Sequence, residues 1–168
     1  MAQVHTYRAT LAWRGSTGVG YTRYDRSHDV LTPPATAGLR LSADPAFRGD
    51  ADLANPEQLL LAAASSCQLL SFLAVAAQAH VDVLSYADDA EAHMPMDVRP
   101  VRITRIVLRP QVVVNLETDV DTVLTLLKQA HDLCYVANTL NAEVVLEPAV
   151  TVRDHPVGER LRRPSACS

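Results

Sequence analysis

The sequence predicts an α+β fold in which a sheet clasps one long central helix. Strand-like segments lie before and after residues 58–81, a stretch that contains no Asp, Glu, Lys or Arg. Such a stretch predicts a buried helix, and a second, amphipathic helical pattern follows at residues 118–133. The length of 168 residues fits one domain, and 48% hydrophobic residues with a mean hydropathy of +0.03 are enough for a core. We expect a single domain over residues 1–154 and a flexible basic tail over residues 155–168.

The N-terminal part predicts a β-hairpin. In residues 5–13 the larger apolar side chains take the odd positions and polar ones take the even positions, which is typical of a half-buried strand. Turn-forming residues follow at 14–18, and residues 21–25 resume an extended pattern. Residues 32–55 hold several Pro and Gly around a short strand-like run at 39–41, so we expect mostly loop there.

The start of the central helix is marked by three residues. Asn55 suits the N-cap, Pro56 suits the first helical position, and Gln58 can close a capping box with Asn55. Because the helix that follows is apolar or small on every side, it should be buried all round. A membrane span is the alternative by length, but Ser and Gln residues interrupt the segment and no basic cluster flanks it.

A single small domain rarely encloses a long helix on all sides, since one sheet face covers only one stripe. The missing cover would come from a second copy, which predicts an obligate homodimer.

Strands and helices alternate in the second half. Residues 81–86 predict a strand, and residues 102–116 predict a long strand with a bulge or an edge position at Pro110. The amphipathic helix at 118–133 leads into a short helical pattern at 135–140. Residues 143–152 predict a last strand.

Composition excludes several classes of function. The net charge is −4, from 15 Lys and Arg against 19 Asp and Glu, and only two Phe and one Trp offer stacking surfaces, so we expect no nucleic-acid partner. The N-terminus has no signal-peptide pattern, and we expect a cytoplasmic protein without a membrane partner. Three cysteines, Cys67, Cys134 and Cys167, are too few and too far apart for a disulfide framework.

Two cysteine motifs resemble those of a known family. The run from Asn55 to Leu60 and the Ala-Ala-Ala-Ser-Ser-Cys that ends at Cys67 resemble the first motif of the OsmC/Ohr organic hydroperoxide reductases. Residues 130–138, around Cys134, resemble the second motif, and the order of elements matches over about residues 5–152. The resemblance is to the broader OsmC-like branch, and further matching segments are residues 13–15, 24–28, 44–50 and 85–86. It implies the OsmC-like fold: antiparallel sheets wrapped around a long central buried helix, in an intertwined homodimer.

The resemblance implies a thiol peroxidase. The Cys67 thiolate would attack the peroxide O–O bond, and Cys134 would capture the resulting sulfenic acid as a disulfide. An external thiol, in this family lipoylated protein or dihydrolipoamide, would reduce the disulfide, and no metal, haem or flavin would be required. Apolar lining from Leu60 and Phe72 would favour organic, lipid-type hydroperoxides. Cys167 has no expected role.

Chemistry at a buried thiol requires a compensating cation. Burial suppresses the thiolate, and an arginine stays charged when it is desolvated, so we expect an arginine beside Cys67. The first candidate is Arg26, followed by Arg48 and then Arg40, and Glu57 would hold the guanidinium in a bidentate pair. Ten residues of helix place Glu57 about 15 Å along the axis from Cys67. Either a long arginine bridges part of this gap or Glu57 serves Cys67 of the partner subunit, and we favour the second.

The sequence departs from the family at three positions. The typical proline after the second cysteine is Tyr135, Gln68 follows Cys67, and Gly20 stands where the Ohr branch has its arginine. Two alternative functions stay open. One is a non-catalytic dimeric protein that binds an apolar small ligand at its interface, with purely structural cysteines; the other, weaker one is a metal site formed by His131, Cys134 and Cys67.

Overall fold

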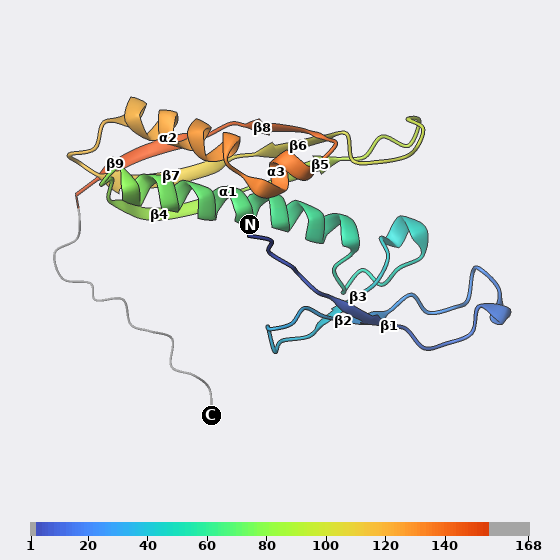
Figure 1. Ribbon diagram of the computed structural model, residues 1–168. Coiled ribbons are helices and arrows are strands. Elements are labelled where there is room, and N and C mark those ends of the chain that lie inside the picture. The colour runs from blue at the N-terminus through green and yellow to red at the C-terminus, as the bar shows by residue number, and fades with distance from the viewer. Residues whose placement is uncertain (1–2, 155–168) are drawn as a thin grey trace. The chain divides into compact units, whose positions relative to one another are not determined.

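The structure is a computed structural model that describes residues 3–154 (Figure 1). The chain divides into two compact units, Met1–Ala62 and Ala63–Ser168. The expected tail, and with it Cys167, lies outside the described residues. The single domain over residues 1–154 stays a prediction.

The first unit is a small antiparallel sheet of order β1-β2-β3. The expected hairpin is present, because β1 pairs with β2, but two details of the prediction are wrong. The first strand has only three residues, all exposed, and residues 21–25 are not a strand. That segment forms turns because the Arg26 guanidinium donates to the carbonyls of Tyr24 and Tyr21, at 2.9 and 2.8 Å. The strands are β1 (Thr10–Ala12), β2 (His28–Leu31) and β3 (Leu39–Leu41), with short 3-10 helices η1 (Thr17–Val19) and η2 (Pro45–Phe47).

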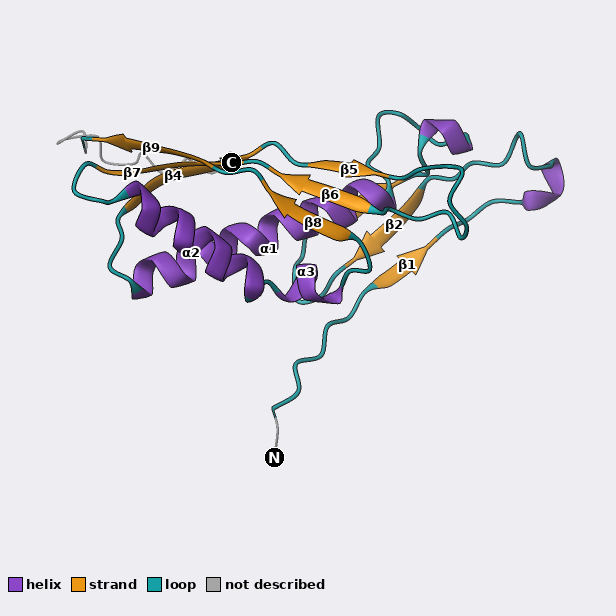
Figure 2. Cartoon of the chain, turned by 90° about the horizontal axis from the view of Figure 1, so that it is seen from above, coloured by secondary structure: helices purple, strands orange, loops and turns teal. Residues whose placement is uncertain are grey.

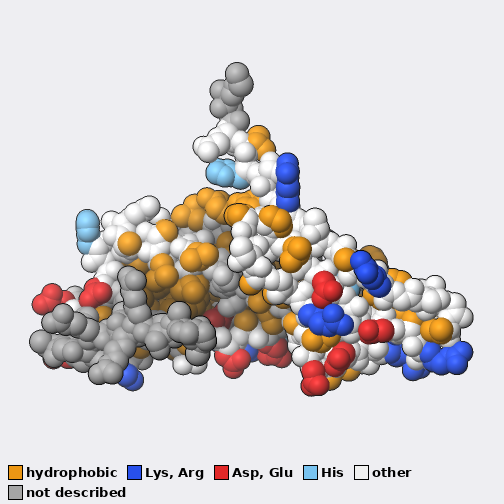
Figure 3. Space-filling model, turned by 90° about the horizontal axis from the view of Figure 1, so that it is seen from below, with side chains coloured by type: hydrophobic (Ala, Val, Ile, Leu, Met, Phe, Trp, Pro, Cys, Tyr) orange, Lys and Arg blue, Asp and Glu red, His pale blue; other side chains and the backbone are white. Residues whose placement is uncertain are grey.

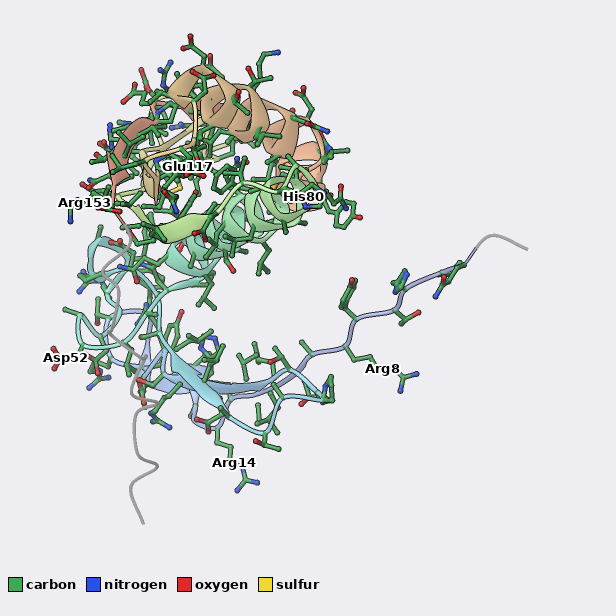
Figure 4. The ribbon with its side chains drawn as sticks, turned by 90° about the vertical axis from the view of Figure 1, so that its left-hand side faces the viewer. Arg8, Arg14, Asp52, His80, Glu117 and Arg153 are labelled. Atoms are coloured by element: carbon green, nitrogen blue, oxygen red, sulfur yellow. The ribbon has the colours of Figure 1, made fainter. Side chains whose placement is uncertain are left out.

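Both ends of the helix α1 (Pro56–Gln78) are fixed by the sequence. Asn55 Oδ1 accepts from the Gln58 N–H at 2.8 Å and Gln58 Oε1 accepts from the Asn55 N–H at 3.0 Å, which confirms the capping box. His80 follows the other end of the helix (Figure 4). It adopts a left-handed conformation, with φ of 58°. Its N–H donates to Ala77 and that of Val81 donates to Ala76, so the helix ends in a Schellman motif.

One stripe of α1 is buried within the chain. The buried residues recur every three or four positions, while Leu70 on another face is 63% exposed. The single chain thus covers only part of α1, as expected for a small domain, and cover of the rest by a second copy stays a prediction. Helix α1 is long and apolar enough to cross a membrane. The core helices of soluble proteins can meet the same criteria of length and composition. The stripe consists of Ala64, Gln68, Phe72, Val75 and Ala76.

The second unit contains two three-stranded sheets, of order β4-β7-β9 and β5-β6-β8. Each sheet combines one antiparallel pair with one parallel pair, β7 with β9 and β6 with β8, so the expectation of purely antiparallel sheets is corrected. The long strands expected at 102–116 and 143–152 are each divided in two, because the chain passes from one sheet to the other at Arg109 and near Pro148. The strands are β4 (Val83–Asp88), β5 (Glu91–His93), β6 (Arg105–Leu108), β7 (Pro110–Asn115), β8 (Glu143–Leu146) and β9 (Ala149–Arg153).

The two later helices confirm the sequence prediction. Asp119 caps α2 (Val120–Asp132), accepting from the Thr122 N–H at 2.9 Å, and α3 (Tyr135–Thr139) follows after Leu133 and Cys134. Helices α1 and α2 lie side by side against the strands of the second unit (Figure 2). The main apolar core is formed by residues of α1, α2 and β7: Phe72, Val75, Ala76, Val112, Val114, Val123, Leu126, Leu127 and Ala130.

Candidate functional site

The fold brings Cys67 and Cys134 together. Cys67 lies near the middle of α1 and is half-buried, whereas Cys134 is the N-cap of α3 and is only 1% exposed. A side-chain hydrogen bond joins the two sulfur groups, and both cysteines carry free thiols. Because α2 ends just before Cys134 and packs against α1, the turn between α2 and α3 holds the second thiol against the first.

Hydrogen bonds favour the thiolate of Cys67. Burial opposes ionisation, but the Cys134 thiol, the backbone N–H groups of Val136 and Tyr135, and the side chain of Ser71 can all donate to the Cys67 thiolate. Together these bonds outweigh burial and lower the pKa of Cys67 below its ordinary value. All of these groups belong to the second unit. The arrangement therefore favours Cys67 as the thiol that ionises first.

The same contacts have the opposite effect on Cys134. Burial and the hydrogen bond to Cys67 raise the pKa of the Cys134 thiol to about 11. The Ala137 N–H donates to Cys134 Sγ at 3.4 Å, which only partly offsets these effects. Cys134 thus remains a neutral thiol at physiological pH, and the two cysteines differ in charge although they are in contact.

A groove of about 630 Å³ opens beside Cys67. Leu70 and Leu133 supply apolar walls, Ser71 and Gln78 supply polar groups, and the exposed Tyr135 stands at its border. The expected lining residues are not among the groove residues: Phe72 is fully buried in the core, and Leu60 lies nearer the start of α1. The groove is large enough for a small organic molecule and places it against the Cys67 sulfur.

The expected arginines all lie in the first unit. Arg26 stacks on the rings of Tyr24 and Tyr21, with its guanidinium carbon 3.9 and 4.9 Å from the ring centres. Arg40 forms an exposed ion pair with Asp29 at 3.2 Å.

Arg48 and Glu57 have no charged partner among the described residues. Arg48 is exposed and ends η2 with φ of 67°. Glu57, in the first turn of α1, is half-buried, so the bidentate pair between Glu57 and an arginine is not formed within the described part of one chain. The roles of these residues stay predictions.

Besides Cys134, the Cys67 thiolate is favoured by three groups that the sequence did not predict: Ser71 and the backbone N–H groups of Tyr135 and Val136. Ser71 could have been found, since it follows Cys67 by four residues and so shares its helix face. The N–H groups of Tyr135 and Val136 could not, because their direction depends on the turn after α2. In residues 3–154 no three His, Cys, Asp or Glu side chains are grouped to hold a metal ion.

The fold and the site define an α+β protein with a pair of thiols of unequal acidity, one of which, Cys67, lines a largely apolar groove. The family model for OsmC-like proteins matches residues 49–149, more than half of the chain. The chain therefore belongs to the OsmC-like family.

Solved structures of this family share the fold. An OsmC-like protein of unknown function from Vibrio cholerae is 28% identical, with a TM-score of 0.79 over 87% of this chain and 100% of that chain. An organic hydroperoxide resistance protein from Legionella pneumophila is 18% identical, with a TM-score of 0.66 over 90% of this chain and all of the other. An organic hydroperoxide resistance protein from Elizabethkingia anophelis is 17% identical, with a TM-score of 0.68 over 91% of this chain and 100% of that chain. The curated proteins contain no match.

Proposed function

We propose that this protein is a cysteine-dependent reductase of organic hydroperoxides that acts in peroxide defence. The observation that supports it most directly is the contact between Cys67 and Cys134, which lowers the pKa of one thiol and raises that of the other. Membership of the OsmC-like family agrees with this proposal, as do the two structural neighbours that are named organic hydroperoxide resistance proteins.

Cys67 is the peroxidatic residue in this mechanism. Its thiolate attacks one peroxide oxygen, the O–O bond breaks, and the alkoxide leaves as an alcohol after taking up a proton. The sulfenic acid on Cys67 then reacts with Cys134, which forms the disulfide and releases water. A dithiol reductant, for which lipoylated protein or dihydrolipoamide is our candidate, restores both thiols.

The apolar lining of the groove indicates which class of hydroperoxide it binds. Apolar residues form much of its wall, and Ser66 and Ser71 are the polar lining residues nearest in sequence to Cys67, whereas Gln78 lies about three turns further along α1. Burying an alkyl or aryl group there adds binding free energy that hydrogen peroxide cannot gain. We therefore expect organic, lipid-type hydroperoxides to react faster than hydrogen peroxide.

The test measures consumption of cumene hydroperoxide with dihydrolipoamide as the reductant. Cys67→Ser should abolish turnover, and Cys134→Ser should stop it after one equivalent, with a sulfenic acid on Cys67 that dimedone traps. Cys167→Ser serves as the matched control and should keep wild-type activity. A wild-type protein that consumes no hydroperoxide, or a Cys67→Ser variant that remains active, contradicts the proposal and favours a non-catalytic binding protein.

We also propose a homodimer that covers the free faces of α1. Hydrophobic side chains gather on the face drawn in Figure 3, and α1 exposes Leu60, Leu70 and Leu73 by 36, 63 and 39%. Such a patch on a helix predicts a protein partner. In a dimer Glu57 would serve Cys67 of the partner subunit, with Arg26 as the first candidate for the guanidinium and Arg48 as the second.

Sedimentation tests the dimer. The wild-type protein should sediment at twice the chain mass of 18.3 kDa, and Leu73→Glu should weaken the dimer. Leu124→Glu, which changes a similarly exposed leucine on α2 (37%), is the control and should leave it intact. A monomeric wild-type protein contradicts the proposal.

A further inference from the structure

Three buried polar atoms of the second unit have no hydrogen-bond partner among the described residues. They are Gln68 Oε1, the Tyr86 hydroxyl and His131 Nδ1. The mechanism proposed above uses none of them. Gln68 is fully buried, although a glutamine in a core is unusual, and its Nε2 donates to the Leu127 carbonyl at 3.1 Å. Orphaned polar groups are rare in folded proteins, so three in one unit require an explanation.

The side chain of Gln68, from α1, contacts α2 one turn before His131. The Gln68 amide rests on the carbonyl of Leu127, and His131 follows Leu127 by one helical turn on the same face. Helical side chains lean toward the N-terminus of their helix, so the His131 ring lies over the turn that contains Leu127. The free oxygen of Gln68 and the free nitrogen of His131 therefore border the same part of the interior.

Tyr86 approaches this region from β4. Its ring packs on Phe72, with the ring centres 5.9 Å apart, and Phe72 lies one turn beyond Gln68 on α1. The pKa of Tyr86 is raised by burial, and further by the charge of Asp88 and by that of Cys134 when it ionises, so the Tyr86 hydroxyl stays protonated. His131 is three residues before Cys134, and the Cys134 N–H donates to the His131 carbonyl at 3.1 Å. His131 thus lies within one turn of the second thiol, and Tyr86 lies on the strand that packs against α1 beside it.

The chemistry of the three atoms is complementary. Gln68 Oε1 accepts a hydrogen bond, the Tyr86 hydroxyl donates one, and an imidazole nitrogen can accept one. An internal water molecule typically makes two to four hydrogen bonds to buried groups of this kind. A water molecule in contact with all three atoms would therefore satisfy them, whereas an apolar molecule would satisfy none.

We propose that Gln68, Tyr86 and His131 form a buried polar site beside Cys134 that holds one internal water, and that His131 accepts the proton of Cys134 through this water when the disulfide forms. This inference rests on the proposed function, because it assigns a proton acceptor to the resolving step. Cys134 has to lose its proton at that step, and its burial leaves it a neutral thiol beforehand.

The step balances in atoms and charge. The Cys134 sulfur forms a bond to the Cys67 sulfur, the S–O bond of the sulfenic acid breaks, and the proton of Cys134 passes through the water to His131. The departing hydroxide takes up a proton from solvent and leaves as water, while the imidazolium returns its proton to solvent. The hydroperoxide is the oxidant, consumed in the preceding step.

The experiment separates oxidation of Cys67 from disulfide formation. Reduced protein is mixed with one equivalent of cumene hydroperoxide, and samples are quenched with dimedone at set times to count the sulfenic acid and the disulfide by mass spectrometry. Because a positioned base typically contributes about a hundredfold or more, His131→Asn should prolong the sulfenic acid at least about tenfold while Cys67 is oxidised at the wild-type rate. Asn can still hydrogen-bond the water but cannot take a proton, and Tyr86→Phe, which removes one partner of the water, should slow only the second step.

The control variant is His80→Asn, which should change neither step. His80 is exposed, and asparagine tolerates its left-handed backbone conformation. Disulfide formation at the wild-type rate in both His131→Asn and Tyr86→Phe overturns the inference, as does equal slowing of both steps. If hydroperoxides never oxidise Cys67, the proposed function fails instead. A high-resolution crystal structure of the reduced protein tests the site independently: a water bonded to all three atoms supports it, and unoccupied density there overturns it.

Discussion

Replacing Tyr135 with proline removes one hydrogen bond from the Cys67 sulfur while leaving the backbone undisturbed. Proline has no N–H, so the bond from Tyr135 to Cys67 is lost, but proline is favoured at the first position of a helix, which Tyr135 occupies in α3. The preceding residue, Cys134, has the extended conformation that proline requires, with φ of −71° and ψ of 109°. The variant should therefore fold.

The magnitude follows from the strength of a hydrogen bond to an anion. Such a bond contributes about 1.5–3 kcal/mol, and the lower end applies here because Cys67 is half-buried and keeps its other donors. The N–H stabilises the thiolate, so its loss raises the pKa of Cys67. About 1.4 kcal/mol corresponds to a factor of ten, and we expect about tenfold less thiolate at neutral pH.

The assay is the rate at which iodoacetamide alkylates Cys67, followed by peptide mass spectrometry across a range of pH. In Tyr135→Pro the alkylation profile should move to higher pH, with about a tenfold lower rate near pH 7. Tyr135→Ala removes the same ring but keeps the N–H, and its profile should match the wild type. Equal profiles for Tyr135→Pro and Tyr135→Ala would refute the assignment of the backbone donor.

Three further predictions concern the scaffold. Asn55→Ala should lower the free energy of unfolding, measured by urea titration, by about 1 kcal/mol, because it removes half of the capping box. The control is Asp29→Ala, which removes only an exposed ion pair and should change the free energy of unfolding by less than about 0.5 kcal/mol. Phe72→Ala should cost about 3–5 kcal/mol, since the ring is fully buried against Tyr86, and a loss below 1 kcal/mol would contradict the packing described here. Because folding raises the pKa of Cys134, its contribution to stability is present below the ordinary value of 9.0 and is lost as the pH rises to about 11; Cys134→Ser should lack this part of the alkaline loss of stability.

Local signals were enough to predict the helices. The capping box at Asn55 and the apolar spacing of α2 depend on residues within one or two turns. The start of α1 was therefore predicted at its observed residue, whereas α2, expected from residue 118, begins at Val120 after the Asp119 cap. The strands were harder, because Arg26 turns the chain at residues 21–25 through contacts that no alternation of side chains records. Likewise, the change of sheet at Arg109 is a property of tertiary structure: its N–H donates to Asp88 on β4 at 2.7 Å, and its side chain pairs with Glu91 and Glu147.

The pairing of Cys67 with Cys134 was implied by family resemblance and not by spacing, since nothing in the intervening residues fixes the distance between the two thiols. What the structure adds is the origin of their asymmetry. The first N–H groups of a helix have no partner within it, and in α3 these donors are divided between the two sulfurs. The Ala137 N–H goes to Cys134, the residue that caps the helix, while those of Tyr135 and Val136 go to Cys67. One short turn therefore stabilises the anion on α1, while burial keeps the thiol next to it neutral. In the mechanism proposed above, the same backbone that holds the two cysteines together would thus set the order in which they react.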